Sequence, residues 1–424
     1  MHRSFAPAVL GLGLSLLLLG ADWPRFRGPD GSGSSPETGL ATEWSESKNL
    51  AWKTALPGPG SSSPIAVKGR IFVTCYSGYA LDRRDPGDVS GLKRHVICVD
   101  AKDGKVLWDK SIDSKQPEVA YRGIGVPNHG YASSTPVTDG ERVYAFFGRT
   151  GVVAYDVEGK EAWRAEIAQD PRTHDFGTAS SPILWEDLVI VPASIECESI
   201  VAFDKKSGKE AWRATVEGYG PWWGTPILVE SGGRKDLVVS LPGEIWGINP
   251  KTGKLRWHSA SFRESNICPS PVAAGGVVYA TGGRQAQVAA VRAGGKGDAS
   301  KENVIWSKQG GSYINSPVVD GGHLYYVTDR GIANCMKAET GESVYQERLE
   351  DAGMVYASPL LADRKIYIVT RRSGTFVLDA NPQFKVIARN RIAGDDSDFN
   401  ASPAVSDGKI YLRSDRALYA LKNN

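Results

Sequence analysis

The stretch Asp204-Lys-Lys-Ser-Gly208-Lys-Glu-Ala-Trp212 decides the fold, because variants of it recur along the chain. In each copy an Asp or Asn caps its own backbone and a Gly takes a positive φ, so the segment is a tight turn. Close copies occupy 100–108, 156–163 and 249–257, and a degenerate copy occupies 337–345. Each turn is expected to start an outer strand whose aromatic residue packs on the next unit. These docking aromatics are Trp52, Trp108, Trp163, Trp212, Trp257, Trp306 and Tyr345.

A Ser/Thr-Pro pair precedes each alternating apolar run, and its spacing sets the length of the repeat. The pairs begin at Ser63, Thr135, Ser181, Thr225, Ser270, Ser316, Ser358 and Ser402. Their prolines are 72, 46, 44, 45, 46, 42 and 44 residues apart. Between pair and turn lies a hairpin signal, Asp-Gly flanked by alternating apolar residues, as in 136–144 and 403–411. Each repeat therefore holds four antiparallel strands, here named A to D, which is the content of a propeller blade.

The two ends of the chain complement each other. The last repeat runs out at Asn424 without its strand D, and Asn49-Leu-Ala-Trp52 supplies a spare strand before the first repeat. We therefore predict an all-β fold, an eight-bladed β-propeller with four-stranded antiparallel blades. Its ring is closed by the N-terminal strand, which covers an otherwise exposed sheet edge. An open-ended solenoid, the alternative for a tandem repeat, would leave both ends unpaired.

The N-terminus predicts export. Met1-His2-Arg3 is a short positive segment, and the apolar run over 8–19 that follows is too short to span a bilayer comfortably. With the small residues Gly20 and Ala21 after it, the pattern indicates a signal peptide over 1–21, an N-terminal extension over 22–48 and a propeller over 49–424. The alternative is an uncleaved N-terminal anchor. We expect a periplasmic or otherwise extracytoplasmic monomer with no membrane span after cleavage.

Charge and cysteine content exclude some functions. The formal net charge of +2 argues against a nucleic-acid binder that works through bulk charge. The five cysteines show no metal-ligand spacing. Cys75 and Cys98 fall on neighbouring strands, which leaves open a cross-strand disulfide or two small buried residues. Cys335, like Cys98, occupies a repeat position that alanine fills elsewhere, which favours a small buried residue there.

The repeat Ala-x-Asp-x-x-Thr/Ser-Gly-Lys-x-x-Trp resembles the tryptophan-docking repeat of quinoprotein (PQQ-type) propellers, from about Asn49 to Leu421. That family includes PQQ-dependent alcohol dehydrogenases and the BamB-type outer-membrane assembly lipoprotein. The opening 22–29, Asp-Trp-Pro-Arg-Phe-Arg-Gly-Pro, resembles the start of PQQ-like propeller proteins of planctomycete-type bacteria. The missing lipobox separates the chain from the usual BamB. The resemblance is specific for fold and poorly specific for function.

One face of the predicted ring carries the candidate functional residues. The long B–C loop 76–95 and the D–A loop 113–133 share this face, where six of the eight B–C loops carry Arg. Those arginines indicate either carboxylate recognition or a salt-bridged, solvated rim. The D–A loops end beside the channel, where aromatic and amide groups converge into a ligand site, although each alone is more often a packing residue. The candidate ligand-binding residues are Asn128, His129, Tyr131, His174, Trp222, Trp223, Asn266, Arg284, Tyr313, Asn315, Tyr356 and Asn400.

Three classes of function are compatible with this reading. We favour a non-catalytic propeller that binds a protein, peptide or glycan outside the cytoplasm, as BamB-like scaffolds do. The resemblance also suggests a PQQ-dependent dehydrogenase, but that family sandwiches its quinone between a Trp and a disulfide of adjacent cysteines, a pair absent from this sequence. A hydrolase or lyase would depend on His129 and on His174 with Asp175, and no G-x-S-x-G motif accompanies them. We therefore assign no catalytic residue, metal or cofactor.

Overall fold

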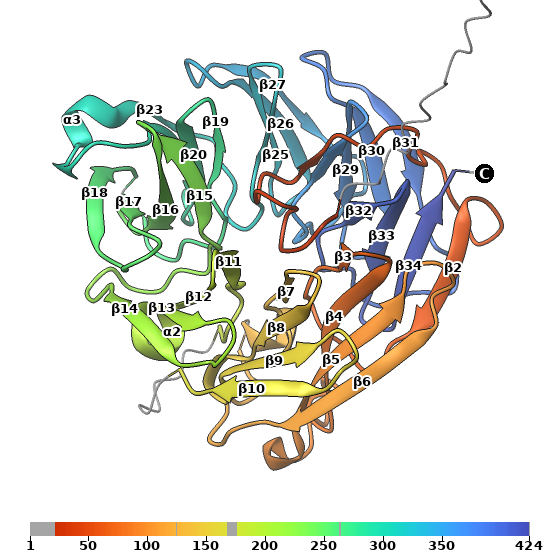
Figure 1. Cartoon of the computed structure of the whole chain (residues 1–424). Coiled ribbons are helices and arrows are strands. Elements are labelled where there is room, and N and C mark those ends of the chain that lie inside the picture. The colour runs from red at the N-terminus through yellow and green to blue at the C-terminus, as the bar shows by residue number, and fades with distance from the viewer. Residues whose placement is uncertain (1–21, 124, 168–175, 263, 424) are drawn as a thin grey trace, which may run out of the picture.

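The computed structural model describes residues 22–123, 125–167, 176–262 and 264–423. The expected signal peptide and the candidate His174 lie outside these residues. Within them the strands form eight sheets that follow one another around a central channel (Figure 1). The predicted eight-bladed β-propeller is confirmed.

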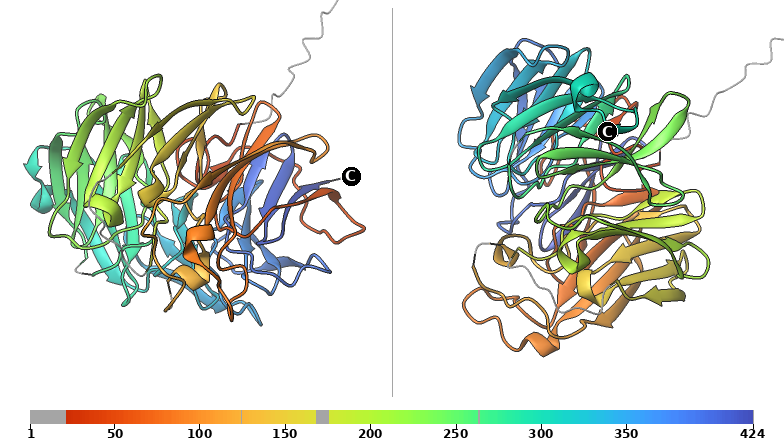
Figure 2. Two further views of the ribbon diagram at one scale, coloured as in Figure 1. Left: turned by 90° about the horizontal axis from the view of Figure 1, so that it is seen from below. Right: turned by 90° about the vertical axis from the view of Figure 1, so that its left-hand side faces the viewer.

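Each blade pairs its strands in the order A to D, with strand A beside the channel and strand D at the rim (Figures 1 and 2). Blade 1 consists of β3 (Ile65–Val67), β4 (Arg70–Ser77), β5 (Lys93–Asp100) and β6 (Val106–Asp113). Blade 2 consists of β7 (Val137–Thr138), β8 (Arg142–Phe146), β9 (Val152–Asp156) and β10 (Glu161–Ala165). Blade 3 consists of β11 (Ile183–Trp185), β12 (Leu188–Ala193), β13 (Ser199–Asp204) and β14 (Glu210–Thr215). Blade 4 consists of β15 (Ile227–Ser231), β16 (Arg234–Leu241), β17 (Glu244–Ile248) and β18 (Leu255–Ala260).

The second half of the ring repeats the pattern. Blade 5 consists of β19 (Val272–Ala274), β20 (Val277–Gly282), β21 (Gln287–Arg292) and β23 (Val304–Gln309). Blade 6 consists of β24 (Val318–Asp320), β25 (His323–Val327), β26 (Ile332–Lys337) and β27 (Ser343–Arg348). Blade 7 consists of β28 (Leu360–Ala362), β29 (Lys365–Val369), β30 (Thr375–Asp379) and β31 (Val386–Asn390). Blade 8 consists of β32 (Ala404–Ser406), β33 (Lys409–Arg413), β34 (Ala417–Lys422) and, from the other end of the chain, β2 (Leu50–Ala55).

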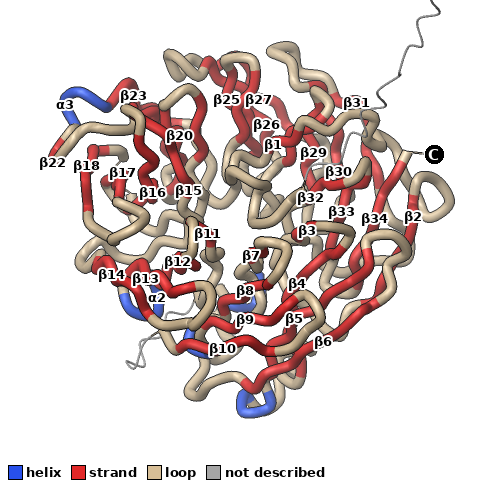
Figure 3. The backbone as a smooth tube through the Cα atoms, viewed as in Figure 1, coloured by secondary structure: helices blue, strands red, loops and turns tan. Residues whose placement is uncertain are grey.

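Helical turns occur only in the connections of the described chain (Figure 3). They are α1 (Val126–His129), α2 (Ser194–Cys197), α3 (Ser300–Asn303) and the 3₁₀ turns η1 (Val89–Gly91) and η2 (Gly148–Thr150). Two further short strands, β1 (Ser34–Ser35) and β22 (Gly297–Asp298), add a fifth strand to blades 7 and 4. In the described chain no helix is long and apolar enough to cross a membrane.

The ring closes through strands from opposite ends of the chain. β2 pairs antiparallel with β34, and Trp52 lies opposite Ala420 in that register. This is the closure that the complementary ends predict. It gives blade 8 its four strands A to D, and the outer edge of that blade is formed by β2.

The outer-strand tryptophans link neighbouring blades. Trp52, for example, donates its indole N–H to the carbonyl of Ala101 at 3.2 Å and packs on Gly104, where an added Cβ would lie 2.7 Å from the ring. Glycine is therefore required there by close approach as well as by its φ of +79°. Trp108, Trp163, Trp212 and Trp306 bond a carbonyl of the next blade in the same way at 2.8–3.1 Å. Tyr345 packs edge-on against Phe384 of the next blade at 5.4 Å.

Trp257 departs from this pattern. Its indole donates to Asp236 of its own blade at 2.7 Å, not to a carbonyl of blade 5. The cause is the long C–D connection of blade 5, because β22 from that connection pairs with β18 and covers the outer edge of blade 4.

The five cysteines are all free thiols. Cys98 pairs with Phe72 in the ladder and Cys75 pairs with His95. Cys75 is thus three positions from the residue opposite Cys98, so the two side chains project from opposite faces of the sheet. This excludes the cross-strand disulfide. Cys98 lies opposite Trp108 and Cys335 lies opposite Tyr345, and both cysteines are buried. A small side chain is needed at each position because the large aromatic ring lies beside it.

The N-terminal extension runs through the channel. Trp23 forms a bridge with Ala66 of blade 1, and the Pro24 carbonyl accepts the backbone N–H of Thr138 in blade 2. The buried Arg25 donates to the carbonyl of Pro226 in blade 4 at 2.9 Å. Figure 1 shows this segment in red, inside the ring near β25, β32 and β3. The extension therefore contacts strands A from widely separated blades.

Arg27 anchors the same segment on the other side of the channel. Its guanidinium donates to the carbonyl of Ser32 at 2.7 Å and to that of Pro317 in blade 6. Burial lowers the pKa of Arg27 to about 9, against the opposing influence of Asp30, so the group stays cationic at neutral pH. β1 then pairs in parallel with β28, through Ser34 opposite Leu361. The extension is thus held to blades 6 and 7 on this side of the channel.

Candidate functional site at the channel mouth

The eight Ser/Thr-Pro pairs form a hydrogen-bonded ring around the channel. The backbone N–H of each Ser or Thr donates to the hydroxyl oxygen of the equivalent residue in the next blade, at 2.8–3.1 Å. The circuit runs through Ser63, Thr135, Ser181, Thr225, Ser270, Ser316, Ser358 and Ser402, and all eight are at most 8% exposed. The proline fixes the residue before it in extended backbone, which aims its N–H at the neighbour. The Ser/Thr-Pro pairs thus occur once in each repeat and also form the wall of the channel.

A cavity of about 340 Å³ lies at this ring and opens toward the D–A loops. All eight ring residues line it, and Phe26 of the N-terminal extension lines it too. Arg25 and Arg27, on either side of Phe26, bond the carbonyls of Pro226 and Pro317, directly before β15 and β24. The extension therefore closes the cavity below the ring. The result is a one-ended pocket.

The structure brings seven of the twelve candidate residues together in this cavity. They are Asn128, His129, Trp223, Asn266, Tyr313, Tyr356 and Asn400. They come from D–A loops of six different blade junctions, so the convergence that the loop order implies is present. Whether they contact a ligand stays a prediction.

The other five candidates lie elsewhere. Trp222 is fully buried beneath the loop, where it forms a bridge with Ile267, and Asn315 is buried with its amide donating to the carbonyl of Ala357 at 2.7 Å. Tyr131 packs in the insertion cluster described below. Arg284 is beside Tyr313 but does not line the cavity. His174 lies outside the described residues.

Sequence reasoning did not name several residues that line the cavity. The ring hydroxyls were treated as markers of the repeat, and Phe26, Asp329 and Met354 were not considered. The ring could have been found, because a residue at the start of every strand A must face the channel. Phe26 could not, because nothing in the sequence places the extension inside the ring.

His129 is held by hydrogen bonds on both ring nitrogens. Nε2 lies 2.6 Å from the carbonyl of Phe176, so it carries the proton and donates, and Nδ1 lies 2.6 Å from the hydroxyl of Ser133, from which it accepts. Burial lowers the pKa of His129, which favours the neutral ring. His129 therefore ties the D–A loop of blade 1 to that of blade 2 and has no free nitrogen for proton transfer.

The aromatic residues of the mouth are also fixed in position. Trp223 donates its indole N–H to the carbonyl of Gly177 at 2.8 Å and meets the edge of Phe176 at 5.7 Å. The ring of Tyr356 is covered by the guanidinium of Arg371, whose carbon lies 5.1 Å from the ring centroid. Ordered aromatic surfaces of this kind bind a ligand at low conformational cost.

The two insertions of blade 1 pack on each other beside the mouth, as their position in the repeat predicts. Tyr76, Tyr79, Leu92, Val126 and Tyr131 form their shared core. The B–C insertion itself is shorter than the predicted 76–95, because β4 continues to Ser77 and β5 begins at Lys93.

Several arginines of this face form ion pairs. Asp398 accepts from Arg371 and Arg372 at 2.5 Å and from Arg83 at 3.1 Å. Burial opposes ionisation of Asp398, but these arginines hold its pKa below the usual range. Arg413, the last residue of β33, is fully buried and donates to the carbonyl of Ser62 at 2.9 Å. The salt-bridged interpretation of these arginines is the one that the contacts favour.

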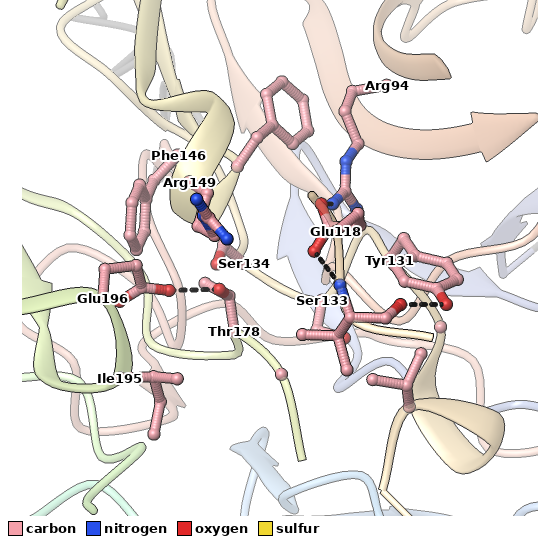
Figure 4. A pocket seen from close by; sticks show the side chains of 15 residues that line it. Arg94, Glu118, Tyr131, Ser133, Ser134, Phe146, Arg149, Thr178, Ile195 and Glu196 are labelled. Carbon is pink, nitrogen blue, oxygen red and sulfur yellow. Dashed lines mark hydrogen bonds and ion pairs between the residues drawn. The ribbon is translucent and has the colours of Figure 1, made fainter. Parts of the chain in front are cut away.

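A second, much smaller cavity of about 20 Å³ lies behind the mouth (Figure 4). Arg94 and Glu118 form a buried ion pair at one side of it, and Thr178 donates to the buried Glu196 at the other. Burial raises the pKa of Glu196 to about 7. The space suits a single water molecule, not an organic ligand. In the described residues no group of His, Cys, Asp and Glu is arranged to hold a metal ion.

The comparisons with known proteins agree with this architecture. The family model for outer membrane protein assembly factor BamB matches residues 34–223 and 92–347. The chain belongs to this BamB family. The two matches overlap because the repeat lets the same model align in more than one blade register. No curated protein sequence matches the chain.

Many solved structures share the fold, among them the following three. BamB from Moraxella catarrhalis is 13% identical, with a TM-score of 0.60 over 88% of this chain and 99% of that chain. The computationally designed Ika8 protein is 11% identical, with a TM-score of 0.59 over 88% and 99% of the two chains. The quinohemoprotein alcohol dehydrogenase ADHIIG from Pseudomonas putida HK5 is 11% identical, with a TM-score of 0.59 over 95% and 81%. At this identity the likeness shows the fold alone, and it includes both an assembly factor and an oxidoreductase.

Proposed function

We propose that this chain is an exported, non-catalytic propeller whose channel mouth binds a protein, peptide or glycan partner. The observation that carries the proposal is the composition of the cavity. Its described lining is rich in aromatic rings, amides and hydroxyls, whereas Asp329 is its one carboxylate and His129 has both nitrogens engaged. Such a surface suits binding more than proton transfer.

A PQQ-dependent dehydrogenase is the alternative that the fold raises, and the described residues do not fit the quinone. PQQ is a tricarboxylate, and no Lys or Arg is among the described residues that line the cavity. Cys268 lines it without a second cysteine, and burial raises the pKa of its thiol to about 12. We therefore derive no redox step.

Two further observations support the proposal. The family is described as outer membrane protein assembly factor BamB, which favours a partner-binding role outside the cytoplasm. The N-terminal pattern over 1–21 favours export. A periplasmic location is part of the proposal.

A ligand screen by thermal shift tests the proposal, because a ligand that binds only the folded state raises Tm. The protein is screened with PQQ plus Ca²⁺, with neutral and acidic oligosaccharides, and with proline-rich and acidic peptides. We expect a saccharide or peptide to raise Tm, and Tyr356→Ala to abolish the shift. Trp185→Ala, which removes a half-buried aromatic from the opposite face, is the matched control.

Assays of enzymatic turnover distinguish the non-catalytic binding protein from a dehydrogenase or a hydrolase. Oxidation of an alcohol after addition of PQQ and Ca²⁺ would overturn the non-catalytic role. So would hydrolysis that His174→Ala abolishes. Absence of any Tm shift that depends on mouth residues would overturn the mouth as the binding site.

A further inference from the structure

We propose that the channel mouth takes a neutral carbohydrate, one or two sugar rings at the end of a glycan. This inference rests on the proposed binding function and names the ligand class of the same cavity. It follows from the charge, the hydrogen-bonding groups, the aromatic surfaces and the closed floor of the cavity.

The charge of the cavity excludes strongly ionic ligands. Among the described residues that line it, Asp329 is the one carboxylate and there is no Lys or Arg. The nearby cations do not line it. Arg25 and Arg27 donate to backbone carbonyls below the floor. Arg371, over the ring of Tyr356, is paired with Asp398. Arg284 lies beside Tyr313 but outside the lining. A ligand with several charges would lose its hydration without gaining partners, which is costly. A neutral polar ligand avoids that cost.

The hydrogen-bonding groups match hydroxyls. Each ring hydroxyl uses one lone pair to accept a backbone N–H, and a hydroxyl has one further lone pair and a proton to donate. No hydrogen bond donated by these eight hydroxyls occurs in the described chain. Each of these hydroxyls can therefore both donate a hydrogen bond to a ligand in the cavity and accept one from it. Sugar hydroxyls also donate and accept at once, so the two sets are complementary.

Amide groups extend this polar pattern toward the opening. Asn400 donates to the carbonyl of Asn128 at 2.9 Å, while its own Oδ1 is buried and has no partner in the described structure. A buried acceptor without a partner destabilises the protein unless a ligand or water supplies a donor. Asn266 also lines the opening. These amides can bind the edge of a sugar ring.

The aromatic side chains supply the second half of carbohydrate recognition. Phe26, Trp223, Tyr313 and Tyr356 line the same cavity as the hydroxyls. A pyranose has apolar C–H groups on its faces and hydroxyls around its rim. Flat aromatic faces pack against the former while amides and hydroxyls bind the latter. A surface that combines both is poorly matched to a purely apolar ligand.

The size and shape of the cavity set the length of ligand that enters. The volume of about 340 Å³ is near the lower end of the range of about 300–1,000 Å³ typical of small-molecule pockets. Because the N-terminal extension closes the floor, a chain cannot thread through the ring. A glycan must enter by its end.

Binding of neutral disaccharides, measured by isothermal titration calorimetry, tests the inference. The panel contains cellobiose, maltose, lactose, mannobiose and diacetylchitobiose, with glucuronic acid and a proline-rich decapeptide for comparison. We expect at least one neutral disaccharide to bind. Tyr313→Ala should weaken it at least tenfold, whereas Tyr313→Phe, which keeps the ring, should weaken it less than threefold.

Trp185→Ala on the opposite face should leave the affinity unchanged, and thermal unfolding of each variant shows that it folds. Binding of the decapeptide or of glucuronic acid alone, with loss on Tyr313→Ala, would overturn the carbohydrate inference and leave the proposed binding function standing. Binding of no probe would overturn the carbohydrate inference, and the wider ligand screen would then decide the proposed function.

Discussion

The backbone N–H of Ser402 donates to the hydroxyl oxygen of Ser63 at 3.0 Å. The last repeat is therefore joined to the first by the same bond that joins every repeat to its successor. These two residues are 339 positions apart in sequence. The bond lies at the base of the mouth, so ring closure and the shape of the candidate site depend on each other.

The Ser402–Ser63 bond can be tested by removing its acceptor. Ser63→Ala leaves a buried N–H without a partner, which should lower the free energy of unfolding by about 1–3 kcal/mol in urea titrations. Ser63→Thr is the matched control, because Thr135 and Thr225 occupy the same ring position in other blades. Equal stability of Ser63→Ala and the native protein would contradict the structural role of the ring.

Closure by β2 predicts a local effect of Trp52→Ala. Loss of the buried indole should lower the free energy of unfolding by about 3–5 kcal/mol. It should also speed hydrogen exchange in β34, because the first and last strands are held together only by noncovalent contacts. Trp163→Ala removes an equally buried indole inside the ring and should leave exchange in β34 slow. Protected β34 amides in Trp52→Ala would show that β2 does not hold the ring shut.

The buried Glu196 predicts a pH-dependent stability. Burial raises the pKa of its carboxyl from an ordinary value of 4.5 to about 7, so between these values the folded state binds more protons than the unfolded state. Stability should therefore fall as pH rises from 4.5 to about 7 and level off above it, by about 3 kcal/mol in total. Unfolding titrations across pH 4–8 measure this slope.

Glu196→Gln should remove that slope, because the amide keeps an acceptor for Thr178 and does not ionise. The exposed Glu217→Gln should leave the slope unchanged. An unchanged slope in Glu196→Gln would assign the pH dependence to other groups, such as Asp415, whose pKa burial raises to about 6.

Because Arg27 anchors the N-terminal extension to blade 6, we predict that the extension stabilises the folded propeller. Arg27→Met keeps the volume but removes the bonds to the carbonyls of Ser32 and Pro317, and should lower the free energy of unfolding by about 1.5–3 kcal/mol. Arg84→Met at an exposed position should change it by less than about 0.5 kcal/mol. Limited proteolysis should cut the extension of Arg27→Met faster than that of the native protein. Equal proteolysis rates would mean that Arg27 does not anchor it.

The sequence by itself determined the blades, their number and the closure of the ring. These features depend on local chemistry repeated eight times: an alternating apolar strand, a turn at residues such as Gly208, and complementary ends at Trp52 and Leu421. Loop order within a blade then placed Tyr313 and Tyr356 at one mouth, because alternate connections of an antiparallel sheet lie on the same side.

Only the tertiary structure decided what fills the channel and which mouth residues are free to meet a ligand. Arg25 and Arg27 bond to blades far away in sequence, and Phe26 between them lines the cavity. Trp257 turns to Asp236 of its own blade, where β22 from the next blade covers the outer edge. Trp222 and Trp223 are adjacent in sequence, yet one is buried below the loop and the other lines the cavity. The positions of these side chains are determined by packing between segments that are distant in sequence. Such packing produces no repeating pattern in the sequence from which it could be predicted.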